Sequence, residues 1–107
     1  MPLFMAAIKF SPALTKALVD KRRDRRPAAK AALEPADATI KECYFAFGAA
    51  DAIDICGATD AVSAASVSMM LSAAASVETT QLLTMEEAMS AMAKADQIQK
   101  GYTPPAG

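Results

Sequence analysis

The stretch that decides the fold is Cys43-Tyr44-Phe45-Ala46-Phe47-Gly48-Ala49-Ala50-Asp51-Ala52-Ile53-Asp54-Ile55-Cys56. It holds both cysteines, two of the four phenylalanines and one of the two tyrosines of the 107-residue chain. Two apolar runs flank the small residues Gly48-Ala49-Ala50, and this pattern predicts a β-hairpin with strands at residues 39–47 and 51–56. We therefore expect the centre of a β-sheet here.

The segments on either side of the hairpin predict two more strands and four helices. Residues 3–10 and 77–83 are short runs typical of strands. Ser11 followed by Pro12 is a helix-start signature, and Thr84 with Glu87 three positions later is a capping box. Helices are predicted at residues 12–20, 25–34, 61–75 and 85–99.

This order of elements predicts an α+β fold. A split βαβ arrangement of the ferredoxin-like type gives a four-stranded antiparallel sheet with helices on one face. Residues 1–100 are expected to form one domain, and residues 101–107 an extended, proline-rich tail.

Apolar residues fall on both faces of the predicted sheet, because side chains alternate along a strand. In residues 3–10, Leu3, Met5 and Ala7 lie opposite the face that carries Phe4 and Ile8. Helices can cover only one of these faces, and an uncovered apolar face would exceed the few hundred Å² usual for monomers. We expect a second copy of the sheet to cover it, which predicts a homodimer or a higher homo-oligomer.

Charge and composition exclude several classes of partner. The net charge of −1 gives no overall field that favours nucleic acid or an anionic membrane. The most apolar helical stretch, residues 61–77, contains five serines and is shorter than the roughly 20 apolar residues that span a bilayer. Two cysteines do not form a secreted disulfide scaffold, and no signal peptide is recognised, so a cytoplasmic location is expected.

The chain contains no histidine. The commonest general base, metal ligand and proximal haem ligand is therefore missing. A zinc site built on two cysteines lacks enough further ligands. We expect no metal site and no cofactor.

Two motifs in register carry a resemblance to a known family. They are Tyr44-Phe45-Ala46-Phe47-Gly48-x-x-Asp51 and Thr79-Thr80-x-Leu82-Leu83-Thr84-x-Glu86-Glu87, with Gly101-Tyr102-x-Pro104-Pro105 in the tail. The chain resembles the GYD-domain family, which is grouped with the ferredoxin-like dimeric α/β barrels. It departs from the family pattern at Ala50, where tyrosine is usual, and at Pro35-Ala36-Asp37, where relatives often have a Gly-Gly turn. The resemblance implies a dimeric α/β barrel rather than a particular activity.

Asp51 and Asp54 are the candidate acids. Burial would raise the pKa of either carboxyl and make it a usable acid or base, and Asp51 is preferred because it matches the family motif. The alternative is structural: Asp51 ties down the turn through backbone amides, and Asp54 faces solvent or a salt-bridge partner. Tyr44, Phe47, Gly48 and Asp51 are the candidate contacts for a small apolar ligand.

The cysteines and the basic segment have both functional and structural interpretations. A hairpin centred between Ala49 and Ala50 pairs Cys43 with Cys56 across the strands, within disulfide range. Free buried thiols are the alternative expected in the cytoplasm. The segment 21–26 with Lys30 holds six of the eleven basic residues. It could bind phosphate, an acidic partner or nucleic acid, or it could be a solvated helix junction or an inter-subunit salt-bridge patch.

These observations favour a non-enzymatic role. We expect a homo-oligomeric structural or accessory module that binds a protein partner. The alternatives are a protein that holds a small apolar ligand between sheet and helices, and a cofactor-independent oxygenase or isomerase with Asp51 as base.

Overall fold

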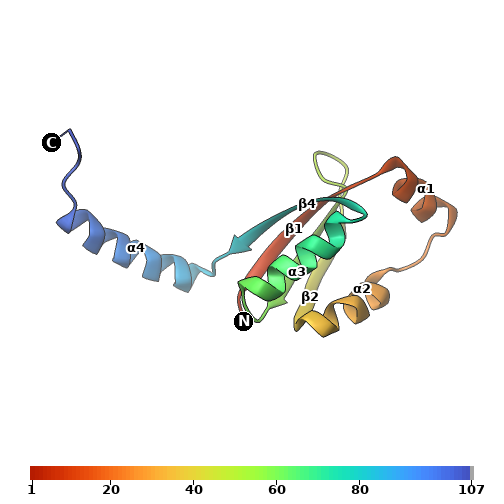
Figure 1. Ribbon diagram of the computed structural model, residues 1–107, viewed down its shortest axis with the longest axis horizontal. Helices are drawn as coiled ribbons and strands as arrows, with labels where there is room; N and C mark the ends of the chain where they lie inside the picture. The colour runs from red at the N-terminus through yellow and green to blue at the C-terminus, as the bar shows by residue number, and fades with distance from the viewer. Residues whose placement is uncertain (107) are drawn as a thin grey trace.

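The strands and helices follow the predicted order along the chain (Figure 1). The computed structural model describes residues 1–106. Its elements are β1 (Leu3–Phe10), α1 (Pro12–Asp20), α2 (Arg26–Leu33), the 3-10 turn η1 (Glu34–Ala36), β2 (Ala38–Phe45), β3 (Ala52–Ala58), α3 (Ala61–Ser72), β4 (Ala75–Leu82) and α4 (Met85–Gly101).

The four strands form one antiparallel sheet in the order β2-β3-β1-β4. The first and third strands are central, and the second and fourth form the edges, which is the ferredoxin-like arrangement that the sequence predicts. The predicted fold class is confirmed.

The register of the β2–β3 hairpin differs from the prediction. Cys43 pairs with Asp54, and Cys56 pairs with Ile40, so the predicted pairing of the two cysteines is wrong. The turn closes one residue earlier than expected, because the Ala46 amide donates to the Asp51 carbonyl at 2.8 Å. A register shift between Ile40 and Glu42 then moves the pairing again. Both cysteines are free thiols.

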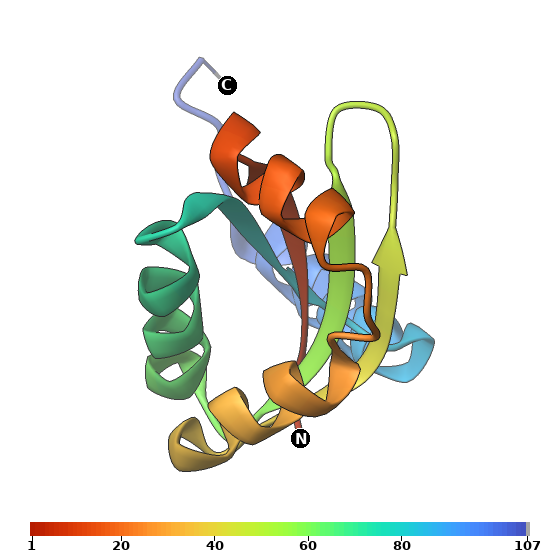
Figure 2. The ribbon, with the colours of Figure 1, turned by 90° about the vertical axis from the view of Figure 1, so that its right-hand side faces the viewer.

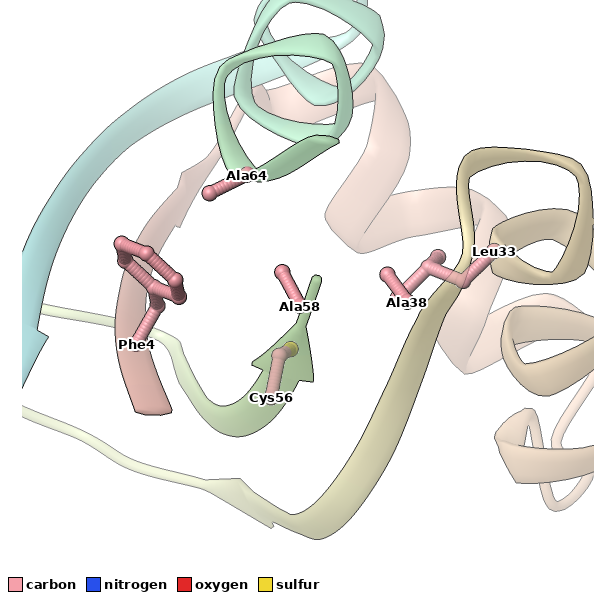
Figure 3. Packing of buried hydrophobic residues seen from close by; sticks show 6 residues of the cluster. All are labelled: Phe4, Leu33, Ala38, Cys56, Ala58 and Ala64. Atoms are coloured by element: carbon pink, nitrogen blue, oxygen red, sulfur yellow. The ribbon is translucent and has the colours of Figure 1, made fainter. Parts of the chain in front are cut away.

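α2 and α3 cover one face of the sheet, which we call the helix-covered face (Figure 2), whereas α1 lies past the end of β1 (Figure 1). Ala64 of α3 faces Phe4 and Ala58 of the sheet, and Leu33 of α2 packs beside Ala38 (Figure 3). The small side chain at Ala64 lets α3 lie close to the strands. A second cluster, Ala6, Ile8 and Ala52 with Phe10, Leu71, Ala75 and Val77 around it, extends the core toward the other end of the sheet.

Local signals explain where the helices begin. Ser11 Oγ accepts from the Leu14 amide at 3.2 Å, and Asp60 Oδ1 accepts from the Ser63 amide at 2.9 Å. Asp24 Oδ1 accepts from the Arg26 amide at 2.9 Å at the start of α2. These bonds satisfy amides that the first turn of a helix leaves without partners.

The fourth helix does not join the helix-covered face. It continues from the end of β4 and projects from the body on the side opposite α1 and α2 (Figure 1). None of its residues is buried. The radius of gyration is 17.9 Å, against about 13 Å for a compact domain of this length. α2 and α3 supply the helical residues that pack against the sheet, and α4 supplies none.

The tail follows α4 directly. Gly101 is the last helical residue, and residues 102–106 form neither helix nor strand; the last position of the predicted tail, residue 107, lies outside the described residues. Among residues 1–106, no helix combines the length and the apolar character that crossing a membrane requires.

Candidate functional site

The helix-covered face carries one acidic side chain on β3, Asp54, between two buried apolar neighbours. Asp54 pairs with Ala6 on β1 and with Cys43 on β2, so it points to the same side as these residues. Its neighbours on that side of β3 are Ala52 and Cys56, and both are buried. The Oδ1 atom of Asp54 is buried and has no hydrogen-bond partner among residues 1–106.

A buried polar atom without a partner is unfavourable. Leaving such a group unsatisfied costs about 1–3 kcal/mol, and more when it is charged. An unpartnered group in a native fold calls for an explanation, such as a functional role. Sequence reasoning preferred Asp51, although the alternation of Ile53 and Ile55 with Ala52 and Cys56 already places Asp54 on the core side.

The two thiols near Asp54 are protonated at neutral pH. Burial, followed by hydrogen bonding to the Asp54 carboxyl and its charge, raises the pKa of Cys43 to about 11. Burial and the charge of Asp54 raise the pKa of Cys56 to about 11. Because the thiolate is the reactive form, neither cysteine is an activated nucleophile in this environment.

Asp51 has the surroundings of a structural residue. Its Oδ2 accepts from the Phe10 amide at 2.8 Å, and its Oδ1 accepts from Lys9 Nζ at 3.2 Å. Its own amide donates to the Ile8 carbonyl at 2.8 Å. The Phe10 amide, and then Lys9, lower the pKa of Asp51, so its carboxylate is a weaker base than a free aspartate. These bonds tie the β2–β3 turn to the end of β1.

The other candidate ligand contacts do not converge with Asp51. Tyr44 lies on the face opposite the helices and is 55% exposed. Phe47 is fully exposed at 104%, in the turn beside Gly48. A side chain at Gly48 would meet nothing within 4 Å, so no close backbone approach requires glycine there.

The enclosed space between the sheet and α3 is small, although a more open groove of about 390 Å³ lies beside it between α3 and β4. The cavity between β1, β3 and α3 has a volume of about 20 Å³, which is room for a single water. Its lining is mainly small and apolar, with Phe4, Ala58 and Ala64 among the residues around it. A ligand of ordinary size would need this layer to open.

The sheet face opposite the helices is apolar at its centre. We call it the open face and define it by Leu3, Met5 and Ala7 of β1 and Ile53 and Ile55 of β3, which the strand register places side by side. All five side chains are half-buried by their own neighbours. No buried residue of α4 covers them, and α2 and α3 lie on the far side (Figure 2).

Polar side chains surround this apolar centre. Glu42 and Tyr44 of β2, Glu78 of β4 and Lys9 of β1 share the open face by register. At one end, Gly57 is buried, and a Cβ there would come within 2.9 Å of Met1 Sδ. An apolar centre with a polar rim is the usual anatomy of a protein–protein interface.

A single copy exposes more surface than a compact monomer of its size. An 11.1 kDa monomer exposes roughly 5,700 Å², whereas this chain exposes 7948 Å². Within residues 1–106 no large side chain is fully buried. The core of one copy is therefore small, and it consists of Phe4, Ala6, Ile8, Leu33, Ala38, Ala52, Cys56, Ala58 and Ala64.

The basic segment between α1 and α2 is exposed, and Asp24 of the same segment neutralises part of its charge. Arg26 forms an ion pair with Asp24 at 2.6 Å. This arginine lowers the pKa of Asp24 to about 2. The pair fixes the start of α2, in agreement with the structural interpretation of the segment as a solvated helix junction.

Comparison with known proteins gives one family. A family model described as the GYD domain matches residues 4–92, from β1 into α4. No curated protein and no solved structure matches the chain. Because the match covers most of the 107 residues, the chain belongs to the GYD domain family.

Proposed function

We propose that this GYD domain is a homo-oligomeric interaction module, in which a second copy covers the open face. Its role is structural or accessory: the assembled copies present a surface to a protein partner. The observation that carries the proposal is the apolar centre of the open face, which the chain leaves uncovered by its own helices.

The surface area supports self-association. The excess over a compact monomer is on the order of 2,000 Å² per chain. Permanent homodimers bury roughly 2,000–5,000 Å² in total over both partners. The excess area is therefore large enough to supply one partner's share of such an interface.

The charges on the open face do not oppose pairing of two identical faces. The polar rim carries two lysines and two glutamates: Lys9, Lys41, Glu42 and Glu78. The side chain of Lys41 lies over Gly57. A two-fold interface brings one patch against a copy of itself, so a rim of a single sign would be repulsive. A rim with two charges of each sign is compatible with self-docking.

A charge at the centre of the open face tests the proposal. In Ile55→Asp, each copy would bury an unpaired carboxylate in the interface, so light scattering after gel filtration should give a single-copy mass. Val19→Asp is the matched control, because Val19 is 62% exposed on α1 and lies away from the open face. A folded Ile55→Asp variant with the oligomeric mass of the wild type would contradict the proposal.

Ligand binding between sheet and helices is the second candidate, and the unpartnered Oδ1 of Asp54 favours it. A small apolar molecule with a hydroxyl group would donate to this oxygen after the layer opens. 1-Naphthol is a suitable probe, and naphthalene, which lacks the donor, is its control. This candidate predicts saturable binding of 1-naphthol but not of naphthalene, and loss of that binding in Asp54→Asn. If 1-naphthol shows no saturable binding, this ligand class is excluded.

The enzymatic alternative uses Asp51 as a base toward an apolar substrate. Its two hydrogen bonds and its lowered pKa argue against it, and Asp51→Asn tests it directly. Unchanged turnover of a substrate in this variant would remove Asp51 from the reaction.

A further inference from the structure

The helix α4 is the largest part of the chain that lacks packing partners. It has 17 residues, or about 25 Å of helix, and no buried side chain. With α4 included, the molecule measures 61 × 29 × 22 Å. A helix in water gains most of its stability from packing an apolar face, so a well-formed α4 calls for a surface to pack against.

One side of α4 is suited to packing. Met85, Met89 and Met92 follow one another at positions i, i+4 and i+7 and therefore share a face. They are 75%, 64% and 64% exposed. Ser90 and Lys94 lie on the opposite side of the helix by the same spacing. Methionine is the flexible apolar residue that adapts best to a partner surface.

The connection to β4 directs α4 away from its own sheet. Only Leu83 and Thr84 separate the two elements. The Glu87 amide donates to Thr84 Oγ1 at 3.1 Å, and the Thr84 amide donates to Glu87 Oε1 at 2.9 Å. This capping box fixes the backbone of Thr84. For α4 to fold back over its own open face, the chain would have to reverse direction within two residues, and Thr84 is one of them.

The position of α4 limits which surface it can pack against. It leaves the body beyond the end of the sheet that is farther from α1 and α2 (Figure 1), and none of its residues is buried against its own chain. A second copy that covers the open face and reaches past this end of the sheet would stand beside α4. By the two-fold relation, each copy would meet the α4 of its partner.

We propose that α4 is an exchanged arm, whose methionine face packs against the second copy in the dimer. This inference rests on the proposed sheet-to-sheet dimer and adds a second contact to it. The occupant of the methionine face is another copy of this chain. The excess exposed area, on the order of 2,000 Å² per chain, is larger than the roughly 800 Å² that one partner contributes to a standard interface, which leaves surface for both contacts.

Oxidative footprinting of the full chain tests the arm. The rates of sulfoxide formation by hydrogen peroxide are measured by mass spectrometry at Met85, Met89 and Met92, with Met69 as the reference. Met69 is 75% exposed on α3, on the helix-covered side of the sheet. In the wild-type dimer the α4 methionines should react several-fold more slowly than Met69. In the single-copy Ile55→Asp variant the rates should become similar.

The outcomes separate the two proposals. A doubled mass with equal rates at α4 and Met69 overturns the arm and leaves the sheet dimer standing. Slow rates that persist in Ile55→Asp show α4 covered by its own chain, which also overturns the arm. A single-copy mass for the wild type overturns both. Ala7→Glu replaces Ile55→Asp if that variant does not fold.

A pair of variants measures what the methionine face contributes to affinity. Met89→Ser with Met92→Ser removes two buried apolar side chains per arm and should raise the dimer dissociation constant by at least about tenfold. Ser90→Ala with Lys94→Ala on the opposite side of α4 is the matched control and should leave it unchanged. Equal constants for both variants would contradict the arm.

Discussion

At the scale of single residues, two aspartates three positions apart have opposite surroundings. Asp51 accepts hydrogen bonds from Phe10 and Lys9, and these favour its charged form. Asp54 lies among core residues with a buried oxygen that has no partner in residues 1–106. The hydrogen bonds of Asp51 favour the folded state, whereas a buried oxygen without a partner is unfavourable. Polar groups retained against stability are concentrated at functional sites.

Asp51→Asn should lower stability at neutral pH and flatten its dependence on acid. The folded-state pKa of Asp51 is depressed, so its contribution is present above the unfolded value near 4 and is lost as the pH falls through the folded value. Urea unfolding at pH 7 and pH 3 measures this. Asp20→Asn is the control, because Asp20 forms only an exposed pair with Lys16. An equal loss of stability on acidification in wild type and Asp51→Asn would contradict the assigned role.

Asp54→Val should raise the unfolding free energy by about 1 kcal/mol or more, because it removes a buried oxygen that lacks a partner. Thr79→Val is the matched control: Thr79 also lies across from Ala6, but its Oγ1 donates to Ser68 Oγ at 3.2 Å. That variant should be neutral or less stable. Chemical denaturation compares the two, and a destabilised Asp54→Val would show that the carboxylate has a structural partner.

At the scale of elements, signals carried by adjacent residues were predictable from the sequence. Ser11 and Thr84 mark helix starts because a cap needs only its own first turn. The hairpin register was not predictable, because Gly48-Ala49-Ala50 does not specify one turn type and the shift near Ile40 depends on strand pairing. The separation of Tyr44 from Phe47 has another cause: β2 ends at Phe45, so Phe47 lies in the turn and not on the strand.

The position of α4 could not be predicted from the sequence, for a different reason. Its capping box predicts that a helix begins at Met85, but not where that helix packs. Packing depends on which sheet face is free and on whether another copy is present, and neither is a property of residues 84–101 alone.

Thr84→Ala should destabilise the first turn of α4 by about 1 kcal/mol, because the Glu87 amide loses its acceptor. Hydrogen exchange at the first-turn amides of α4 should become faster. Glu87→Gln is the control, because glutamine retains the reciprocal bond of a capping box. If Thr84→Ala leaves the exchange unchanged, the capping box does not hold the start of α4.

At the scale of the whole molecule, one copy leaves much of its apolar surface unpacked. It has a thin core on the helix-covered face, an apolar centre on the open face and a helix that projects from its body. The proposed second copy, which covers both the open face and α4, would account for all three features.

The most direct test is the mass of the full wild-type chain by sedimentation equilibrium over a wide concentration range. The account predicts twice the 11.1 kDa chain mass, or a larger even multiple, at micromolar concentrations. A mass of 11.1 kDa throughout that range, from a chain that still unfolds in one cooperative transition, would contradict it.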